Sequence, residues 1–259
     1  MVKLGIIGGT GVYDPNLIED AKKIKVHTPF GKTSDLITTG MFQGKELAII
    51  PRHGSGHRIN PSNVNYRANI WALKQLGVTH ILASSAVGSL KEEYKPGDLA
   101  IVDQFIDRTY KRKTTFYEGD QVCHVSTAEP FCPSLRNLFS EEAKNLGLSF
   151  HDKGTCVVVE GPRFGTKAES NMFRSWGAEL VGMTMHPEAT LAREAEICYA
   201  TVAMVTDYDC WKEKSVDIEE VLATMKNNVE KVKKLFTAVV PRINDDNCSC
   251  RQALKTSLI

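Results

Sequence analysis

The chain lacks any long hydrophobic run. No apolar stretch approaches the roughly 20 residues that a membrane-spanning helix needs. The apolar segment at the N-terminus, Val2–Gly8, is too short for the hydrophobic region of a signal peptide. Neither sign of charge is in excess, because 32 Lys and Arg residues are balanced by 31 Asp and Glu residues. Nucleic-acid binding usually leaves a basic footprint, so we expect no nucleic-acid partner, no membrane partner and a cytoplasmic location.

The common nucleotide-binding motifs are also missing. The sequence contains no Walker-type G-x-x-x-x-G-K-[ST]. The glycine-rich segment Gly8-Gly-Thr-Gly11 lacks the G-x-G-x-x-G spacing, and Pro15 falls where the helix after a Rossmann turn would run. A nicotinamide-dependent oxidoreductase is therefore disfavoured, and cofactor absorbance after purification would test that alternative.

The seven cysteines divide into two groups. Cys248-Ser-Cys250 lies in a polar tail, and its spacing is tighter than the usual C-x2-4-C of zinc sites, with no His nearby in sequence. We therefore expect no metal site, and a strained disulfide remains the alternative for this pair. The other five lie in apolar or mixed contexts that predict buried free thiols: Cys123, Cys132, Cys156, Cys198 and Cys210.

Strand-like and helix-like segments alternate along the whole chain, which predicts an α/β fold in one continuous domain, 1–259, with a C-terminal tail at about 241–259. The predicted strands are 3–7, 46–50, 80–85 (followed by a turn at 86–89), 99–105, 155–160, 180–183 and 197–205. The predicted helices are 65–77, 133–147, 167–177, 187–196 and a long one capped by Ser215, with an apolar stripe from Val221 through Leu222 to Val239. The polar segment 103–119 is expected to be a solvated loop rather than a lid.

Two carboxylates, Asp207 and Asp209, follow the longest apolar strand, 197–205. Open α/β sheets bind their ligands at the carboxyl ends of strands. On an extended backbone, residues two apart point to the same side, so both acids should enter one pocket. Such a pair suits a ligand edge with N–H donors, such as that of a purine.

Hydrogen-bond donors follow four other predicted strands, and this convergence indicates a small anion. An arginine pairs with carboxylates and phosphates through its bidentate fork. Without a Walker motif or a magnesium triad, the anion is best interpreted as free phosphate. Phosphate beside a purine reader predicts phosphorolysis of a nucleoside. The donor segments are Gly8–Gly11 with Thr10, Arg52-His53, Ser84-Ser85-Ala86 and Met183–Glu188.

Long motifs along almost the whole chain carry a family resemblance. They include Gly5-Ile-Ile-Gly-Gly-Thr-Gly11, Thr28-Pro-Phe-Gly31, Arg52-His-Gly54, Asn65-Tyr-Arg-Ala-Asn-Ile-Trp-Ala-Leu73, Gly88-Ser-Leu-Lys-Glu-Glu93, Asp103-Gln-Phe-Ile-Asp-Arg108, Ala128-Glu-Pro-Phe-Cys-Pro133, Glu160-Gly-Pro-Arg-Phe164 and Thr206-Asp-Tyr-Asp-Cys-Trp211. With these motifs the chain resembles the methylthioadenosine phosphorylase branch of the purine nucleoside phosphorylases. The Cys-Ser-Cys tail resembles that of the archaeal members.

The resemblance implies a single α/β domain with a twisted, mixed central sheet flanked by helices. It implies a trimer or a dimer of trimers, and inorganic phosphate as co-substrate without any cofactor. Phosphate would bind at the positions that match the family motif: Thr10, Arg52, His53, Ser85, Ala86 and Thr184.

The resemblance also assigns the nucleoside. Met183 would lie under the ribose, Phe164 would pack on the base, and Asp207 and Asp209 would read N7 and the 6-substituent. His124 would come from a neighbouring subunit, while Ile218 and Val221 would form apolar walls for a methylthio group. Asp207 is the predicted acid that protonates N7 as the purine leaves. The departures from the family pattern are Met185-His186, Gly165 and Ser85.

Two alternative functions remain beside phosphorolysis of 5′-methylthioadenosine or adenosine. A 6-oxopurine phosphorylase would act on methylthioinosine, inosine or guanosine, although an aspartate at 207 favours the 6-amino base. A nucleoside-binding sensor without turnover would lack the phosphate grip, and Arg52, His53 and Thr10 are all present.

Overall fold

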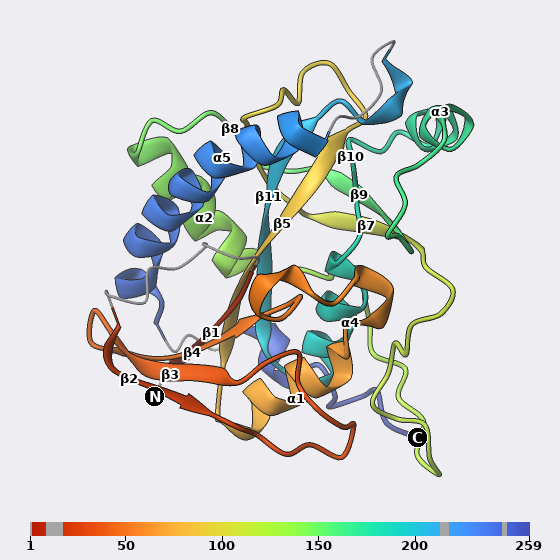
Figure 1. Cartoon of the computed structure of the whole chain (residues 1–259). Helices are drawn as coiled ribbons and strands as arrows, with labels where there is room; N and C mark the ends of the chain where they lie inside the picture. The colour runs from red at the N-terminus through yellow and green to blue at the C-terminus, as the bar shows by residue number, and fades with distance from the viewer. Residues whose placement is uncertain (1, 9–17, 213–217, 245–247) are drawn as a thin grey trace.

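The computed structural model describes residues 2–8, 18–212, 218–244 and 248–259, and these residues form an α/β fold around a mixed sheet (Figure 1). Within the described residues the sheet has 11 strands. They are β1 Lys3–Gly8, β2 Glu19–Ile24, β3 Ile37–Phe42, β4 Lys45–Pro51, β5 His80–Ser89, β6 Leu99–Ile101, β7 Gln104–Arg108, β8 Phe150–His151, β9 Thr155–Val159, β10 Leu180–Gly182 and β11 Cys198–Asp207.

The centre of the sheet is β5, which pairs with three strands. Its first half lies parallel to β1, its whole length lies parallel to β11, and its last residues lie antiparallel to β10. The main path runs β2-β3-β4-β1-β5-β10-β9-β7, and β11, β6 and β8 branch from β5. Because β1, β4, β5 and β11 are parallel and buried on both faces, their sequences are continuous apolar runs. Their carboxyl ends therefore open at the same edge of the sheet.

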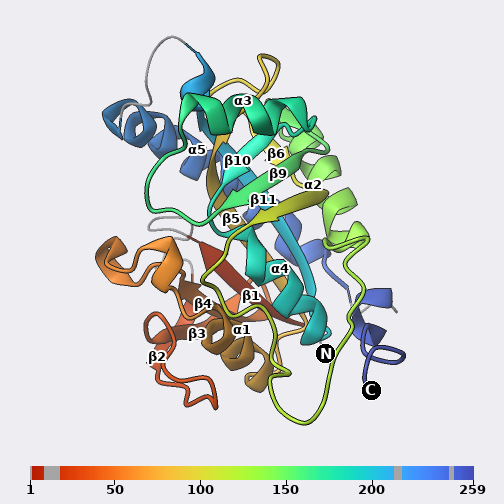
Figure 2. The same cartoon turned by 90° about the vertical axis from the view of Figure 1, so that its right-hand side faces the viewer.

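Helices cover both faces of this sheet (Figures 1 and 2). Helices α1, Tyr66–Gln75, and α4, Met185–Glu194, contact each other and pack into one core layer. Helices α2, Pro133–Asn145, and α5, Ile218–Val239, contact each other in the second layer. Helix α3, Lys167–Ser175, begins with a capping box in which Thr166 and Glu169 exchange hydrogen bonds. This helix fixes the loop that precedes it.

The α/β class, the single mixed sheet and most elements confirm the sequence prediction, but three segments were assigned wrongly. The turn expected at 86–89 is strand, because β10 and β11 both pair with that part of β5. The segment 99–105 forms two strands, since β6 pairs with β11 and β8 whereas β7 pairs with β9. The segment 103–119 is therefore not simply a solvated loop. Strands β2, β3 and β8 were not predicted.

The long helix α5 also differs from expectation at one position. Its stripe is buried at Val229, Val232, Leu235, Phe236 and Val239, but Leu222 is exposed. The reason is positional, because Leu222 lies at the mouth of a cavity rather than over the sheet. The predicted cap Ser215 lies outside the described residues.

The remaining sequence expectations concern membranes and cysteines. No helix in the described part of the chain combines the length and the apolar character that crossing a bilayer requires. All seven cysteines are free thiols, with Cys132, Cys156, Cys198, Cys210 and Cys250 buried. No bond joins Cys248 to Cys250 in the structure. The prediction of a buried thiol was wrong for Cys123, which is half-buried.

Candidate active site

A cavity of about 780 Å³ opens where the parallel strands end. Strand ends β4, β5, β10 and β11 line one side of it, and the first turns of α5 line another. Of the sequence-predicted site residues, Thr10 lies outside the described residues, and His124 is exposed and does not line the cavity. The rest line it together: Arg52, His53, Ser85, Ala86, Phe164, Met183, Thr184, Asp207, Asp209, Ile218 and Val221.

Arg52 follows β4 and is held almost fully buried at the end of the cavity. Its Nε donates to Oε1 of Glu188 at 2.5 Å and its Nη2 to Oε2 at 2.8 Å, while Nη1 donates to the Ser84 carbonyl at 2.8 Å. Tyr199 donates its hydroxyl to Glu188 at 3.0 Å. A guanidinium has five N–H donors, so two remain after these bonds. Arg52 is therefore oriented by the protein and keeps donors for an anion.

Glu188 is a site residue whose partner the sequence did not reveal. It lies on α4 and is fully buried, 136 residues from Arg52. The available signal was an acidic residue beside the apolar residues Pro187, Ala189 and Leu191, since an acid in such a setting is rarely buried without a partner. The partner itself depends on how α4 packs beside β4.

His53 is buried beside Arg52 and its imidazole is neutral. Burial, followed by the Arg52 charge, lowers the pKa of His53 from 6.5 to about 4. Its Nδ1 lies 2.9 Å from the Ile59 carbonyl, which fixes the proton on Nδ1. The neutral ring presents Nε2 to this cavity as an acceptor, and not as the donor that the sequence analysis expected.

Two hydroxyls meet at the same end of the cavity. Ser85 from β5 and Thr184, which precedes α4, have Oγ atoms 2.7 Å apart, and both side chains are buried. Ala86 follows Ser85 on the edge of the cavity. Together with Arg52, these groups can donate several hydrogen bonds to one small anion.

Asp207 and Asp209 lie at the carboxyl end of β11 and line the cavity, as predicted, but not through strand alternation. Asp207 ends the strand, whereas Asp209 has φ +49° in a short 3-10 turn and donates its N–H to Oδ1 of Asp207 at 2.7 Å. Thr206 donates to Oδ2 of Asp207 at 2.8 Å. A side chain at Gly88 would reach within 3.0 Å of Asp207, so glycine leaves room for both acids.

The pKa of Asp207 is raised. Burial is the main cause, and the neighbouring Asp209 charge adds to it. The hydrogen bonds from Thr206 and from the Asp209 N–H oppose the shift without reversing it. Asp207 can therefore hold a proton closer to neutral pH than an exposed aspartate does.

Met183 and Phe164 also line the cavity. Gly161 has φ +67°, and a Cβ there would lie 2.6 Å from the Met183 sulfur, so glycine is required for the sulfur to lie over this loop. Phe164, on the same loop, is 45 % exposed and lines the cavity. These two side chains offer an apolar surface for a flat ring and a sugar.

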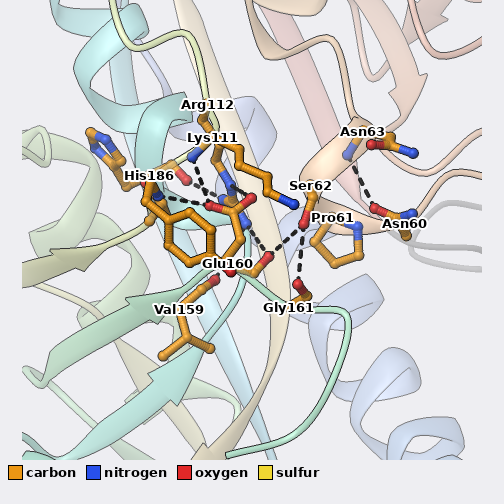
Figure 3. Close-up of polar contacts among 12 residues, drawn as sticks. Asn60, Pro61, Ser62, Asn63, Lys111, Arg112, Val159, Glu160, Gly161 and His186 are labelled. Carbon is orange, nitrogen blue, oxygen red and sulfur yellow. Dashed lines mark hydrogen bonds and ion pairs between the residues drawn. The ribbon is translucent and has the colours of Figure 1, made fainter.

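A hydrogen-bond network, drawn in Figure 3, holds the loop that carries Phe164. Ser62 donates to the carbonyls of Glu160 and Gly161 at 3.0 and 3.2 Å. Arg112, with its side chain 1 % exposed, donates to the Glu160 carbonyl at 2.9 Å and the His186 carbonyl at 2.6 Å. The polar segment 103–119 thus contributes a buried anchor for the site, which the sequence analysis did not predict.

His186, one of the departures from the family pattern, lies behind the cavity. Its side chain is buried, with Nε2 3.2 Å from Oδ2 of Asp107 and Nδ1 3.2 Å from the Thr190 hydroxyl. Burial lowers the pKa of this histidine. It does not line the cavity, so it supports the backbone next to Thr184 instead of contacting a ligand.

Part of the cavity wall is apolar. Ile218, Val221 and Met225 come from the start of α5, and Met204 comes from β11. Ile218 is 56 % exposed, so this wall also forms part of the cavity mouth. It suits a small hydrophobic group rather than a charged one.

Comparisons with known proteins identify the family. The model of the phosphorylase superfamily matches residues 3–241. The S-methyl-5'-thioadenosine phosphorylase of Pyrococcus furiosus is 54% identical over 260 residues, covering 100% of both chains. A solved methylthioadenosine phosphorylase from an antarctic soil metagenomic library has a TM-score of 0.95 at 41% identity, covering 100% of this chain and 92% of that one.

A second solved structure, the Schistosoma mansoni methylthioadenosine phosphorylase in complex with adenine, has a TM-score of 0.91 at 41% identity and covers 95% of this chain and 93% of that one. Identity above 50% over the full length goes well beyond similarity of fold. The chain belongs to the phosphorylase superfamily, in its methylthioadenosine phosphorylase family.

Proposed function

We propose that this protein cleaves 5′-methylthioadenosine with inorganic phosphate, giving adenine and 5-methylthioribose 1-phosphate. One observation carries the proposal. The buried Arg52 and Asp207, whose pKa is raised, line a single cavity together with apolar side chains. This cavity can then hold the anion, the sugar and the base at the same time.

Phosphate binds at the Arg52 end in this proposal. The two remaining guanidinium donors, the Ser85 and Thr184 hydroxyls and the Ala86 backbone N–H supply hydrogen bonds to its oxygens. Neutral His53 accepts a hydrogen bond from a protonated phosphate oxygen. Thr10, which the family resemblance adds to this set, follows β1, and the N–H of Arg52 donates to the Gly8 carbonyl at the end of that strand.

The nucleoside occupies the rest of the cavity. Phe164 packs on the purine, Met183 contacts the ribose, and the Asp207–Asp209 pair reads N7 and the 6-amino group. Ile218 and Val221 contact the methylthio group at the 5′ position. A carboxylate accepts an N–H hydrogen bond from a 6-amino purine, and the similar Schistosoma mansoni enzyme was solved in complex with adenine.

The reaction follows from this order. A phosphate oxygen attacks C1′ as the bond between C1′ and N9 breaks, and the electron pair of that bond goes to the purine. Asp207 donates its proton to N7, so that the base leaves neutral. The sugar is oxocarbenium-like in the transition state, and the bound phosphate dianion stabilises its charge. General acid catalysis of this type contributes about 10²–10⁴-fold.

A phosphate-dependent assay tests the proposal and its nearest alternative together. Methylthioadenosine, adenosine, methylthioinosine and inosine are compared with and without phosphate. We expect methylthioadenosine to have the highest kcat/KM, and no release of base without phosphate. A preference for the inosine forms would establish the 6-oxopurine phosphorylase instead. Binding without turnover for all four would establish a sensor.

From the family resemblance we further propose that the protein forms a trimer or a dimer of trimers in the cytoplasm, and that His124 of one subunit enters the cavity of its neighbour. The exposed position of His124, outside its own chain's cavity, supports this arrangement. Light scattering gives the assembly size. Mixing His124→Ala chains with chains that carry Asp207→Asn tests complementation, because a shared site should regain activity in mixed assemblies.

A further inference from the structure

Arg112 contacts two backbone segments that carry different parts of the catalytic cavity (Figure 3). Its Nη1 donates to the His186 carbonyl at 2.6 Å, at the start of α4. Its Nη2 donates to the carbonyls of Glu160 at 2.9 Å and Val159 at 3.3 Å, at the end of β9. One guanidinium therefore joins the start of α4 to the loop that follows β9.

The two segments contribute different groups to the cavity. Thr184, whose hydroxyl belongs to the proposed phosphate site, lies two residues before His186. Phe164, which packs on the purine in the proposed function, lies four residues after Glu160. Arg112 itself does not line the cavity. It can therefore act on a ligand only through the backbone that it holds.

The guanidinium of Arg112 is itself held in place. Its side chain is 1 % exposed, and Oε1 of Glu160 lies 3.7 Å from its Nε. Oε2 of the same carboxylate accepts the N–H groups of Tyr110 at 2.8 Å and Lys111 at 3.2 Å, so Glu160 also fixes the turn that carries Arg112. Separating a buried charge from its partner is costly, which keeps the guanidinium where it reaches both sets of carbonyls.

Each segment also has a contact of its own. Ser62 donates to the carbonyls of Glu160 and Gly161 at 3.0 and 3.2 Å, which holds the loop after β9. On the other segment, Nε2 of His186 lies 3.2 Å from Oδ2 of Asp107. Of the three side chains Ser62, Asp107 and Arg112, only that of Arg112 contacts both segments.

We propose that Arg112 is a positioning residue that couples the phosphate part of the cavity to its nucleoside part. Phosphate that binds the Thr184 hydroxyl orders the start of α4, and Arg112 transmits this order to the loop that carries Phe164. The inference rests on the proposed function, because it uses the two parts of the cavity assigned there. Coupling between two binding sites is reciprocal, so the nucleoside should also strengthen the binding of phosphate.

Arg112→Lys separates the geometry of this residue from its charge. Lysine keeps a charge beside Glu160, but its single ammonium cannot replace a planar fork that serves carbonyls on two segments. We expect the variant to raise the KM for phosphate and the KM for methylthioadenosine each by about fivefold or more, which is the effect of about one lost hydrogen bond.

Two further variants serve as comparisons. Ser62→Ala loosens the loop after β9 without touching α4, so it should raise the KM for methylthioadenosine and leave the KM for phosphate unchanged. Arg108→Lys makes the same substitution at an exposed residue of the same segment, and both KM values should stay at those of the wild type.

The two KM values distinguish positioning from a merely structural role. Loss of folded protein lowers the activity per chain but leaves both KM values as they are in the wild type. Arg112→Lys with both KM values unchanged would therefore refute the coupling. A rise in only one of them would also refute it, because Arg112 would then hold only one segment.

Hydrogen–deuterium exchange tests the coupling in the wild type without any variant. Phosphate alone should slow the exchange of backbone N–H groups in the loop 160–165, although it is proposed to contact none of them. In Arg112→Lys this protection should be lost while that of Ser85 and Ala86 remains. Protection confined to the phosphate contacts of the wild type would overturn the proposal. A wild type without phosphate-dependent activity would contradict the proposed function alone, since exchange with phosphate or adenine as the probe still measures the coupling.

Discussion

Replacing Asp207 by Asn isolates the proposed acid from the structure around it. The amide oxygen of Asn can accept the N–H of Asp209, as Oδ1 of Asp207 does at 2.7 Å. The amide NH2 would then face the Thr206 hydroxyl, which can donate to the Val87 carbonyl at 3.2 Å instead. One hydrogen bond is rearranged, so the loss of stability should be on the order of 1 kcal/mol.

The loss of activity should be much larger. A proton donor at N7 contributes about 10²–10⁴-fold, which is about 2.7–5.4 kcal/mol of barrier at 1.36 kcal/mol per factor of ten. Because burial raises the pKa of Asp207, the protonated acid is lost as pH rises through that pKa. The wild type should therefore lose kcat on an alkaline limb, and Asp207→Asn should lack this limb.

The assay is steady-state phosphorolysis of methylthioadenosine from acid to alkaline pH, with phosphate and nucleoside varied separately. We expect Asp207→Asn to lower kcat by the factor above while the KM for phosphate stays within about threefold, because phosphate contacts the Arg52 end. The exposed Asp152→Asn is the matched control and should behave as wild type. The asparagine NH2 should also raise the ratio of methylthioinosine to methylthioadenosine turnover. An equal rise in the phosphate KM, or an unchanged alkaline limb, would refute the role of Asp207.

Three further predictions rest on the same cavity. Glu188→Gln leaves the buried Arg52 charge unpaired and should lower the free energy of unfolding by about 3–5 kcal/mol. Urea denaturation at fixed chain concentration measures this loss, and a loss below about 1 kcal/mol would contradict the pairing. The pKa of His53 falls from 6.5 to about 4 on folding, so the unfolded chain binds more protons between these values. The free energy of unfolding should therefore be unaffected by His53 above pH 6.5 and should fall as the pH is lowered toward 4. His53→Gln should flatten the dependence of the free energy of unfolding on pH in this range. Gly161→Ala forces a side chain against the Met183 sulfur and should raise the nucleoside KM but not the phosphate KM, which initial rates will show.

Local sequence determined much of this protein. Apolar runs predicted the parallel core strands, since strands buried on both faces need such residues. Polar residues just after those runs predicted the site, because parallel strands end at one edge. Arg52, Ser85 and Asp207 were found in this way, and the structure brings them to one cavity.

What the sequence could not give are contacts between residues that no local pattern connects. The burial of Glu188 against Arg52, and the anchoring of the Phe164 loop by Arg112, depend on how α4 and the segment 103–119 pack over the sheet. The geometry of Asp209 was also beyond reach, because a left-handed turn after β11, and not strand alternation, directs it into the cavity.

The cysteines show the same division most clearly. Hydrophobic context, which is a local property, predicted five buried thiols, and all of these except Cys123 are buried in the structure. Tertiary structure alone decided that Cys132 and Cys198 would lie beside the tail pair Cys248 and Cys250. Contacts between residues so distant in sequence follow from the packing of whole elements and leave no periodic signal along the chain.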